Sequence, residues 1–199
     1  MSTIKIDPRR LYANEKTVVS EDRCKQIYLL AMSTRQIAGC AAEVGVYRGG
    51  TARLICEALP RKQVYLFETF TGLPAPTVQD NTHKEGDFAT TTLTEVHDFL
   101  APLENYNLYK GYFPLQHSEV AADKKFAFVH IDVDLFMSTM RCLEFFYPRM
   151  SPGGIIVMDD YEAPTCNGAT EAIKEFFENK PEAVESRTQY QAYIRRQCD

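Results

Sequence analysis

Short apolar segments alternate with amphipathic stretches along most of the chain, and this alternation constrains the fold more than any other feature. The apolar segments have strand length and occupy residues 40–46, 63–68, 106–109, 126–132 and 155–158. Stretches with helical spacing of apolar residues separate most of them. Strands that alternate with helices are typical of a parallel sheet covered on both faces. We therefore expect an α/β fold.

Three further elements extend this pattern at its ends. Ser20-Glu21-Asp22 is a cap signal for an N-terminal helix. Apolar residues at i, i+3, i+4, i+7 and i+8 between Ala169 and Phe177 predict a last amphipathic helix. Residues 183–187 and 191–195 are expected to form an antiparallel hairpin at the edge of the sheet.

Three internal segments carry more specific expectations. Ser151-Pro152-Gly153-Gly154 is expected to be the turn before the strand at 155–158. Residues 69–92 form a long polar stretch with two prolines, and connections of this length are usually functional or mobile. The helix after residue 132 is expected to pack its regularly spaced apolar side chains into the core: Met137, Met140, Leu143 and Phe146.

Length and composition limit the class of protein. A chain of 199 residues suits one domain, here 1–199, with an N-terminal helical segment over about 1–38 and a core over about 39–199. The net charge of −5, without a basic block, argues against nucleic-acid binding. No apolar run approaches the roughly 20 residues of a membrane span, and no secretory signal is visible. Six widely spaced cysteines without a CxxC pair indicate reduced thiols, so a cytoplasmic enzyme is expected.

Acidic and glycine residues mark the ends of the first two strands. Glu43, Gly45 and Gly49 surround the first turn, but their spacing is not that of the GxGxxG dinucleotide motif. The glutamate suits the amino group of a zwitterionic ligand; alternatively, the glycines only shape a tight turn. Glu68, at the end of the second strand, can accept hydrogen bonds from ribose hydroxyls, or it is a solvated strand-end residue.

Four aspartates end the strands at 126–132 and 155–158, namely Asp132, Asp134, Asp159 and Asp160. Asp132 and Asp159 are 27 residues apart, which leaves room for one helix and one strand, so a right-handed crossover brings the two strand ends together. Carboxylates that converge repel each other unless protons or a cation compensate. Hard oxygen ligands suit Mg²⁺ or another divalent cation. The alternative is that each aspartate has only a structural role, as a hydrogen-bonding residue of a turn or a helix cap.

The histidines carry weaker signals. His130 lies within the strand at 126–132 and is more readily a core residue with satisfied hydrogen bonds than a base. His83 lies in the long loop at 69–92 and could reach a substrate, although exposed loop histidines are usually inert.

An ordered set of motifs resembles the macrocin O-methyltransferase family, whose members methylate sugar hydroxyls on natural products. The set covers about residues 20–177 and reads EVGVYRGGT, FETFTGLP, GDF, KGYF, HIDVDLF, YPRMSPGG and MDDY. The resemblance implies a Rossmann-like class I methyltransferase fold with a mostly parallel seven-stranded sheet. It also implies S-adenosylmethionine and Mg²⁺ as cofactors and a small-molecule hydroxyl acceptor. Because family members use the N-terminus for oligomer contacts, a homo-oligomer stays open.

The same resemblance assigns roles to individual residues. It implies Asp132, Asp159 and Asp160 as metal ligands and Asp134 as general base. Around the cofactor it implies Glu43, Gly45 and Gly49 at the methionine part and Glu68 at the ribose. Within the same motifs we expect four more residues near the cofactor: Tyr47, Thr51, Gly111 and Asp132. The chain departs from the family pattern at Glu68, where aspartate is usual, at Phe136, where tyrosine is common, and in a shorter N-terminus.

The expected reaction begins with two vicinal acceptor oxygens on the metal, followed by proton removal by Asp134 and in-line attack on the sulfonium methyl group. The loop at 69–92 would close over the site. A catechol-type phenol is the alternative acceptor, but catechol enzymes usually carry a lysine where this chain has Leu135. An NAD-binding oxidoreductase and a catalytically silent binding module are the other two hypotheses.

Overall fold

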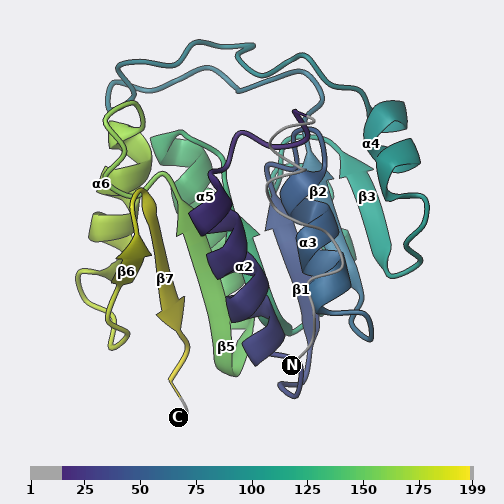
Figure 1. Cartoon of the computed structure of the whole chain (residues 1–199). Coiled ribbons are helices and arrows are strands. Elements are labelled where there is room, and N and C mark those ends of the chain that lie inside the picture. Colours follow the sequence, from purple (N-terminus) through teal and green to yellow (C-terminus); the bar gives the residue numbers. More distant parts are fainter. Residues whose placement is uncertain (1–14, 198–199) are drawn as a thin grey trace.

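A seven-stranded sheet with the order β3-β2-β1-β4-β5-β7-β6 forms the centre of the molecule, as the computed structural model of residues 15–197 shows (Figure 1). Neighbouring strands from β3 to β5 are parallel, and β7 is antiparallel to both β5 and β6. The strands are β1 (Cys40–Val44), β2 (Val64–Glu68), β3 (Tyr106–Lys110), β4 (Phe126–Ile131), β5 (Met150–Asp159), β6 (Glu185–Thr188) and β7 (Gln191–Arg195). The expected mostly parallel α/β sheet is confirmed, and so is the antiparallel pairing near the C-terminus.

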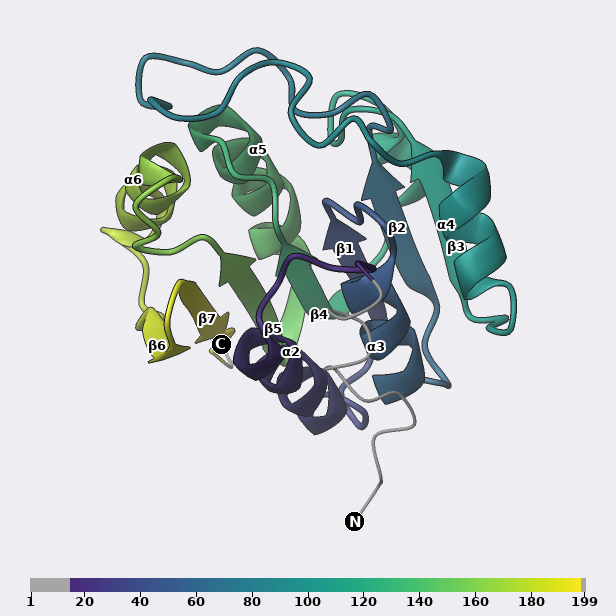
Figure 2. The same ribbon diagram turned by 45° about the horizontal axis from the view of Figure 1, so that its top comes forward.

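Helices cover both faces of this sheet, which Figure 2 shows from its upper edge. They are α2 (Glu21–Ser33), α3 (Gly50–Ala58), α4 (Leu93–Leu100), α5 (Phe136–Phe146) and α6 (Asn167–Phe177), with short 3-10 turns η1 (Ser118–Val120) and η2 (Tyr147–Arg149). Successive strand residues face opposite sides, so Leu66 packs with α2, α3 and α4, whereas Phe67 packs with α5 and α6. Among residues 15–197, no helix combines the length and the apolar character needed to cross a membrane.

The strand order reverses between β1 and β4. From β1 the chain proceeds outward to β2 and β3, and it then returns to place β4 on the other side of β1. In open α/β sheets, ligands bind beyond the carboxyl ends of the strands at such a point. The aspartates after β4 and at the end of β5 therefore lie at the expected place for a site.

Two local predictions were wrong. The segment Ser151–Gly154 is not a turn before β5 but part of the strand, where the register jumps from Phe126 opposite Met150 to Phe128 opposite Ile155. Gly153 has a φ of +78°, and its N–H donates to the Arg196 carbonyl at 2.8 Å. The two glycines therefore form an irregular first part of β5 that pairs with the residue after β7.

The second wrong prediction concerns α5. Met137 and Met140 are only half-buried. The helix begins at Phe136, and its buried side includes Phe136, Thr139, Leu143 and Phe146. In the first turns of the helix, the buried positions therefore lie one residue before the expected Met137 and Met140. Leu143 and Phe146 pack in the core as expected.

The loop at 69–92 crosses the carboxyl ends of the strands and reaches α5 and α6 (Figure 1). Asp80 anchors it, because its Oδ1 accepts a 2.8 Å hydrogen bond from the Phe136 N–H at the start of α5. Its Oδ2 accepts two bonds from Thr77. A Cβ on Gly168 would lie 1.9 Å from Asp80 Oδ1, so only a glycine at this point of α6 allows the approach.

Candidate active site

A cavity lies at the carboxyl ends of β1, β2 and β4, beneath the loop at 69–92. It contains about 820 Å³ of space, part of it open to solvent. Its lining comes from α2, the first three βα turns, the long loop and the segment after β4: Val18, Val19, Arg23, Val44, Gly45, Tyr47, Phe67, Glu68, Thr69, Gly72, Leu73, Pro74, Phe88, Gly111, Tyr112, Phe113, Asp132, Val133, Asp134, Ser138 and Asp160.

The cavity brings together most of the site residues expected from the sequence. Those that line it are Gly45, Tyr47, Glu68, Gly111, Asp132, Asp134 and Asp160. Four others lie behind or beside the lining: Glu43, Gly49, Thr51 and Asp159. Gly49 has a φ of +87° before α3, and a Cβ there would meet Phe99 and Val96, so it serves the turn.

Gly45 is required by the contact between β1 and β4. A Cβ at this position would lie 1.7 Å from the Asp132 carbonyl oxygen, and the backbone φ is +86°. The contact alone excludes any side chain, and the positive φ adds backbone strain for residues other than glycine. Gly45 thus serves the turn, as one of the two expectations had it. Because it has no side chain, the backbones of the first and fourth strands lie in direct contact beside the cavity.

Glu68 presents its carboxylate at the end of β2. Oε2 accepts a 2.7 Å hydrogen bond from the Tyr47 N–H, and Oε1 accepts from the Phe70 N–H at 3.1 Å and from the Thr69 hydroxyl at 3.0 Å. These bonds fix the carboxylate at the cavity wall rather than leaving it solvated. An ionised carboxylate has about four acceptor positions, so one remains for a ligand hydroxyl.

Glu43 has a different partner from the ligand amino group that the sequence suggested. β1 and β4 pair so that Glu43 stands opposite His130, and Glu43 Oε1 lies 2.8 Å from His130 Nδ1. On the other side of the ring, His130 Nε2 lies 2.7 Å from Asp159 Oδ2. All three side chains are fully buried. Glu43 Oε2 is buried and has no hydrogen-bond partner among the described residues, so the expected role of Glu43 at the cofactor stays a prediction. The prediction that His130 is a satisfied core residue agrees with this geometry.

The buried triad has a definite charge state. Burial opposes the imidazolium form, but the hydrogen bonds that His130 donates to Asp159 and Glu43, together with the charges of these carboxylates, outweigh it and raise the pKa of His130 to about 10. Burial likewise opposes the Asp159 carboxylate, yet His130 and Arg23 lower its pKa below the ordinary value. His130 is therefore a cation at neutral pH and joins the ends of three strands through charge-assisted hydrogen bonds.

Arg23 on α2 reaches the same group of carboxylates and was not anticipated from the sequence. Its Nη1 lies 3.0 Å from Asp159 Oδ1 and 4.0 Å from Asp160 Oδ1. Gln191 Nε2 also donates to Asp159 Oδ1, at 3.0 Å. One signal was available: Arg23 lies four residues before Ile27 on the buried stripe of α2, and a cation on an apolar stripe commonly marks a buried anion.

The remaining aspartates face the cavity without comparable compensation. Burial and the charge of Asp160 raise the pKa of Asp132 well above its usual value, and the same two causes act on Asp134. Burial and Asp159 raise the pKa of Asp160 to about 6. Asp160 Oδ2 is buried and has no hydrogen-bond partner among the described residues. Like charges thus accumulate at one point of the wall.

A divalent cation fits this donor set. Asp132 and Asp160 offer carboxylate oxygens to the cavity, and hard oxygen donors suit Mg²⁺. Donor atoms of Asp132, Asp159 and His130 lie within 4.8 Å of one another, so the two strand ends do meet as predicted. Both oxygens of Asp159 already accept bonds from Arg23, Gln191 and His130, however. By the count of about four acceptor positions on an ionised carboxylate, one position on Asp159 Oδ2 remains, and the expected role of Asp159 as a metal ligand stays a prediction.

Comparison with known proteins identifies relatives of the chain. The family described as Macrocin-O-methyltransferase (TylF) matches residues 13–189. Mycinamicin III 3''-O-methyltransferase from Micromonospora griseorubida is 30% identical over 162 residues, 70% of this chain and 61% of the relative. A tetracenomycin-C 4'-O-methyltransferase from Streptomyces olivaceus, 8-demethyl-8-(2,3-dimethoxy-alpha-L-rhamnosyl)-tetracenomycin-C 4'-O-methyltransferase, is 26% identical over 151 residues, 67% of this chain and 57% of the relative. The chain thus spans about three fifths of the length of these two relatives.

Solved structures give the same fold. The O-methyltransferase NovP superposes with a TM-score of 0.79 and 22% identity, covering 92% of this chain and 83% of that protein. The calicheamicin methyltransferase CalS11 superposes with a TM-score of 0.72 and 19% identity, covering 94% and 89%. The Rossmann-like class I methyltransferase fold is therefore confirmed.

Proposed function

Because the chain belongs to the macrocin O-methyltransferase (TylF) family, we propose that it transfers a methyl group from S-adenosylmethionine to a hydroxyl of a sugar or vicinal diol, with Mg²⁺ or another divalent cation bound beside the acceptor. One observation carries the proposal. A single cavity joins the fixed carboxylate of Glu68 to the aspartates that follow β4 and β5, so a ribose-binding acid and a cation-binding group face the same space.

The cofactor would lie across the ends of β1 and β2. Glu68 would accept a hydrogen bond from a ribose hydroxyl at its remaining acceptor position, and Gly45, Tyr47 and Gly111 would line the space around it. Gly45 packs directly against the Asp132 backbone, so no side chain at this position would compete with the cofactor for space. Glu43 would also act through His130 and hold the first and fourth strands in register.

Asp132 and Asp160 would hold the cation at the cavity wall. When bound, the ion would lower the pKa of the acceptor hydroxyl. Asp134 lines the same space, and its raised pKa makes it a stronger base than a solvated aspartate. It is therefore suited to accept the proton of the reacting hydroxyl. The loop at 69–92, anchored by Asp80 to α5, would exclude water from the site.

The acceptor class follows from the relatives and from one residue. The two relatives described above are named for methylating positions 3'' and 4' of glycosylated natural products, and a sugar hydroxyl is the corresponding proposal for this chain. Leu135 is 2% exposed and lies in the core. It replaces the lysine of catechol enzymes with a side chain that offers no charge to a phenol, which favours the sugar over a catechol.

Product analysis tests the proposal. The purified protein is incubated with S-adenosylmethionine, Mg²⁺ and a panel of deoxysugar glycosides and catechols, and a mass increase of one methyl group is sought by mass spectrometry. A parallel incubation with NAD⁺ and alcohol substrates is followed for NADH and an oxidised product. Asp134→Asn is expected to reduce transfer by about 10²- to 10⁴-fold while leaving cofactor affinity unchanged. Transfer to catechols only, a redox product, or cofactor binding without any turnover would each refute the proposed function.

A further inference from the structure

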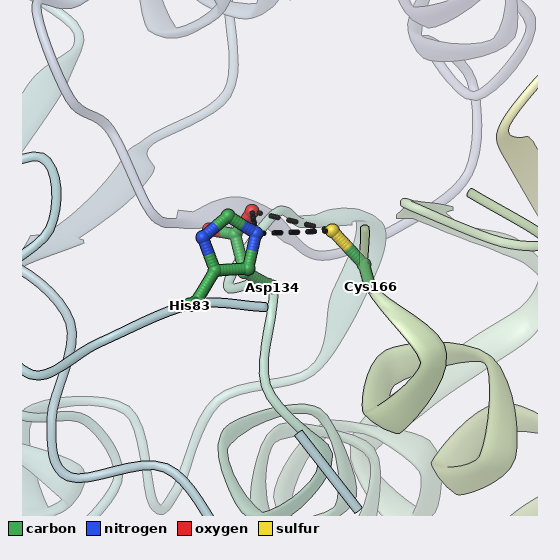
Figure 3. Close-up of side chains that lie close together, drawn as sticks. All are labelled: His83, Asp134 and Cys166. Carbon is green, nitrogen blue, oxygen red and sulfur yellow. Dashed lines mark hydrogen bonds and ion pairs between the residues drawn. The ribbon is translucent and has the colours of Figure 1, made fainter. Parts of the chain in front are cut away.

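Three side chains from separate segments converge beside the aspartates, and their chemistry differs from that of the carboxylate site. His83 comes from the loop at 69–92, Asp134 from the segment between β4 and α5, and Cys166 from the residue before α6. Figure 3 shows that their polar ends point toward one another. The Cys166 Sγ lies 3.5 Å from His83 Nε2 and 3.6 Å from Asp134 Oδ1, and those nitrogen and oxygen atoms are 3.7 Å apart.

These three distances match the edges of a tetrahedral zinc site. Bonds of about 2.3 Å to sulfur and about 2.0 to 2.1 Å to nitrogen and oxygen place sulfur about 3.5 Å from each lighter donor and separate nitrogen and oxygen by about 3.3 Å. Only the last edge has to shorten, by a few tenths of an ångström. We infer that His83, Asp134 and Cys166 bind one Zn²⁺ ion and leave its fourth position open.

The donor types select such an ion over Mg²⁺. A thiolate and an imidazole prefer zinc and similar borderline-soft metals, whereas all-oxygen sites prefer Mg²⁺. Burial raises the pKa of the Cys166 thiol in the metal-free protein, so Cys166 begins as a neutral thiol. Zn²⁺ forms a bond to sulfur, the S–H bond breaks, and the proton leaves to solvent, with no change of oxidation state.

The second ring nitrogen of His83 is held in the manner of zinc-binding histidines. His83 Nδ1 lies 3.4 Å from Asp87 Oδ2, and the same oxygen accepts the Lys84 N–H at 2.9 Å. A carboxylate on Nδ1 places the proton there and leaves Nε2 free as a ligand. The side chains of His83 and Asp134 are 15% and 17% exposed, so an ion can enter from the cavity.

A bound zinc ion would connect the long loop to α6 and occupy an oxygen of Asp134. It would therefore inhibit methyl transfer, a consequence that rests on the proposed role of Asp134 as base. The binding itself does not depend on that role.

Co²⁺ serves as the spectroscopic probe, added to the full-length protein after removal of metals and in excess Mg²⁺, without methyl donor or acceptor. One equivalent is expected to give thiolate-to-cobalt charge-transfer absorption that Zn²⁺ abolishes. Cys166→Ser should remove the band, and His83→Asn should weaken Co²⁺ affinity by at least tenfold. The control, Cys40→Ser, changes a half-buried cysteine at the start of β1 and should leave the band intact. Circular dichroism checks that each variant folds.

Absence of the band in the folded wild-type protein, or its persistence in Cys166→Ser, would overturn the site. Because this readout needs no turnover, it fails or succeeds independently of the proposed methyl transfer. Full transfer activity at zinc saturation would overturn the inhibitory consequence.

Discussion

Replacing His130 with glutamine should destabilise the protein strongly, because the ring bridges two buried carboxylates. Its hydrogen bonds to Glu43 and Asp159 are 2.8 and 2.7 Å long, and none of the three side chains is exposed. Glutamine cannot donate in both directions. Removing one partner of a buried ionic group costs about 3–5 kcal/mol, which corresponds to a fall in melting temperature of roughly 6–20 °C for a chain of this size.

The pH dependence of this loss has a definite sign. The pKa of His130 is raised in the folded protein to about 10, from an ordinary 6.5. Its stabilisation is therefore complete below pH 6.5 and is lost as the pH rises through 10, at about 1.4 kcal/mol per pH unit. The difference in stability between the wild-type protein and His130→Gln should accordingly be largest near pH 6 and shrink toward pH 10.

Urea unfolding followed by far-ultraviolet circular dichroism measures this difference at several pH values. His97→Gln is the matched control, because the His97 side chain is 61% exposed. Surface substitutions usually change the free energy of unfolding by no more than about 0.5 kcal/mol, and we expect the same of His97→Gln. A His130→Gln protein within about 1 kcal/mol of wild type at pH 6, or a difference that does not change with pH, would refute the reasoning.

Two further changes test the cavity and its cover. Glu68→Gln should weaken binding of S-adenosylhomocysteine by about tenfold, or about 1.4 kcal/mol, in isothermal titration; unchanged affinity would remove Glu68 from the ribose site. Gly168→Ala should displace Asp80, whose Oδ1 would lie 1.9 Å from the new Cβ, and thereby cost about 1 kcal/mol of helix capping. Limited proteolysis should then cut residues 69–92 faster than in wild type, as in Asp80→Ala, and an unchanged cleavage rate would show that the anchor does not hold the loop.

The sheet and its helices were predictable because their signals are local. Apolar runs of strand length and a 3.6-residue spacing of apolar side chains depend only on neighbouring residues, and the strand at Gln191–Arg195 begins and ends where the pattern indicated. The start of β5 was missed because Pro152, Gly153 and Gly154 are typical of a turn. They belong to a strand here because their irregular backbone still forms hydrogen bonds with Arg196, the residue after β7.

The sequence predicted which acidic residues meet at the site, but not most of the side chains that contact them. Asp132 and Asp159 meet because one crossover separates them. The bridge between Glu43 and His130 instead depends on the register of β1 against β4, across 87 residues. Arg23, His83 and Cys166 come from a helix, a loop and a turn whose approach to the strand ends is set by tertiary packing. Among these residues only Arg23 carries a local signal, its position four residues before Ile27 on the buried stripe of α2.

Binding of Mn²⁺, detected by electron paramagnetic resonance, tests most directly whether Asp132 and Asp160 hold a divalent cation in the cavity. The wild-type protein should bind Mn²⁺ in competition with Mg²⁺, and Asp160→Asn should lose at least tenfold in affinity, about 1.4 kcal/mol. Glu171→Gln, at an exposed residue of α6, and Cys166→Ser should bind as wild type does. Equal Mn²⁺ affinity in Asp160→Asn and wild type, or no binding to either, would contradict the cation site.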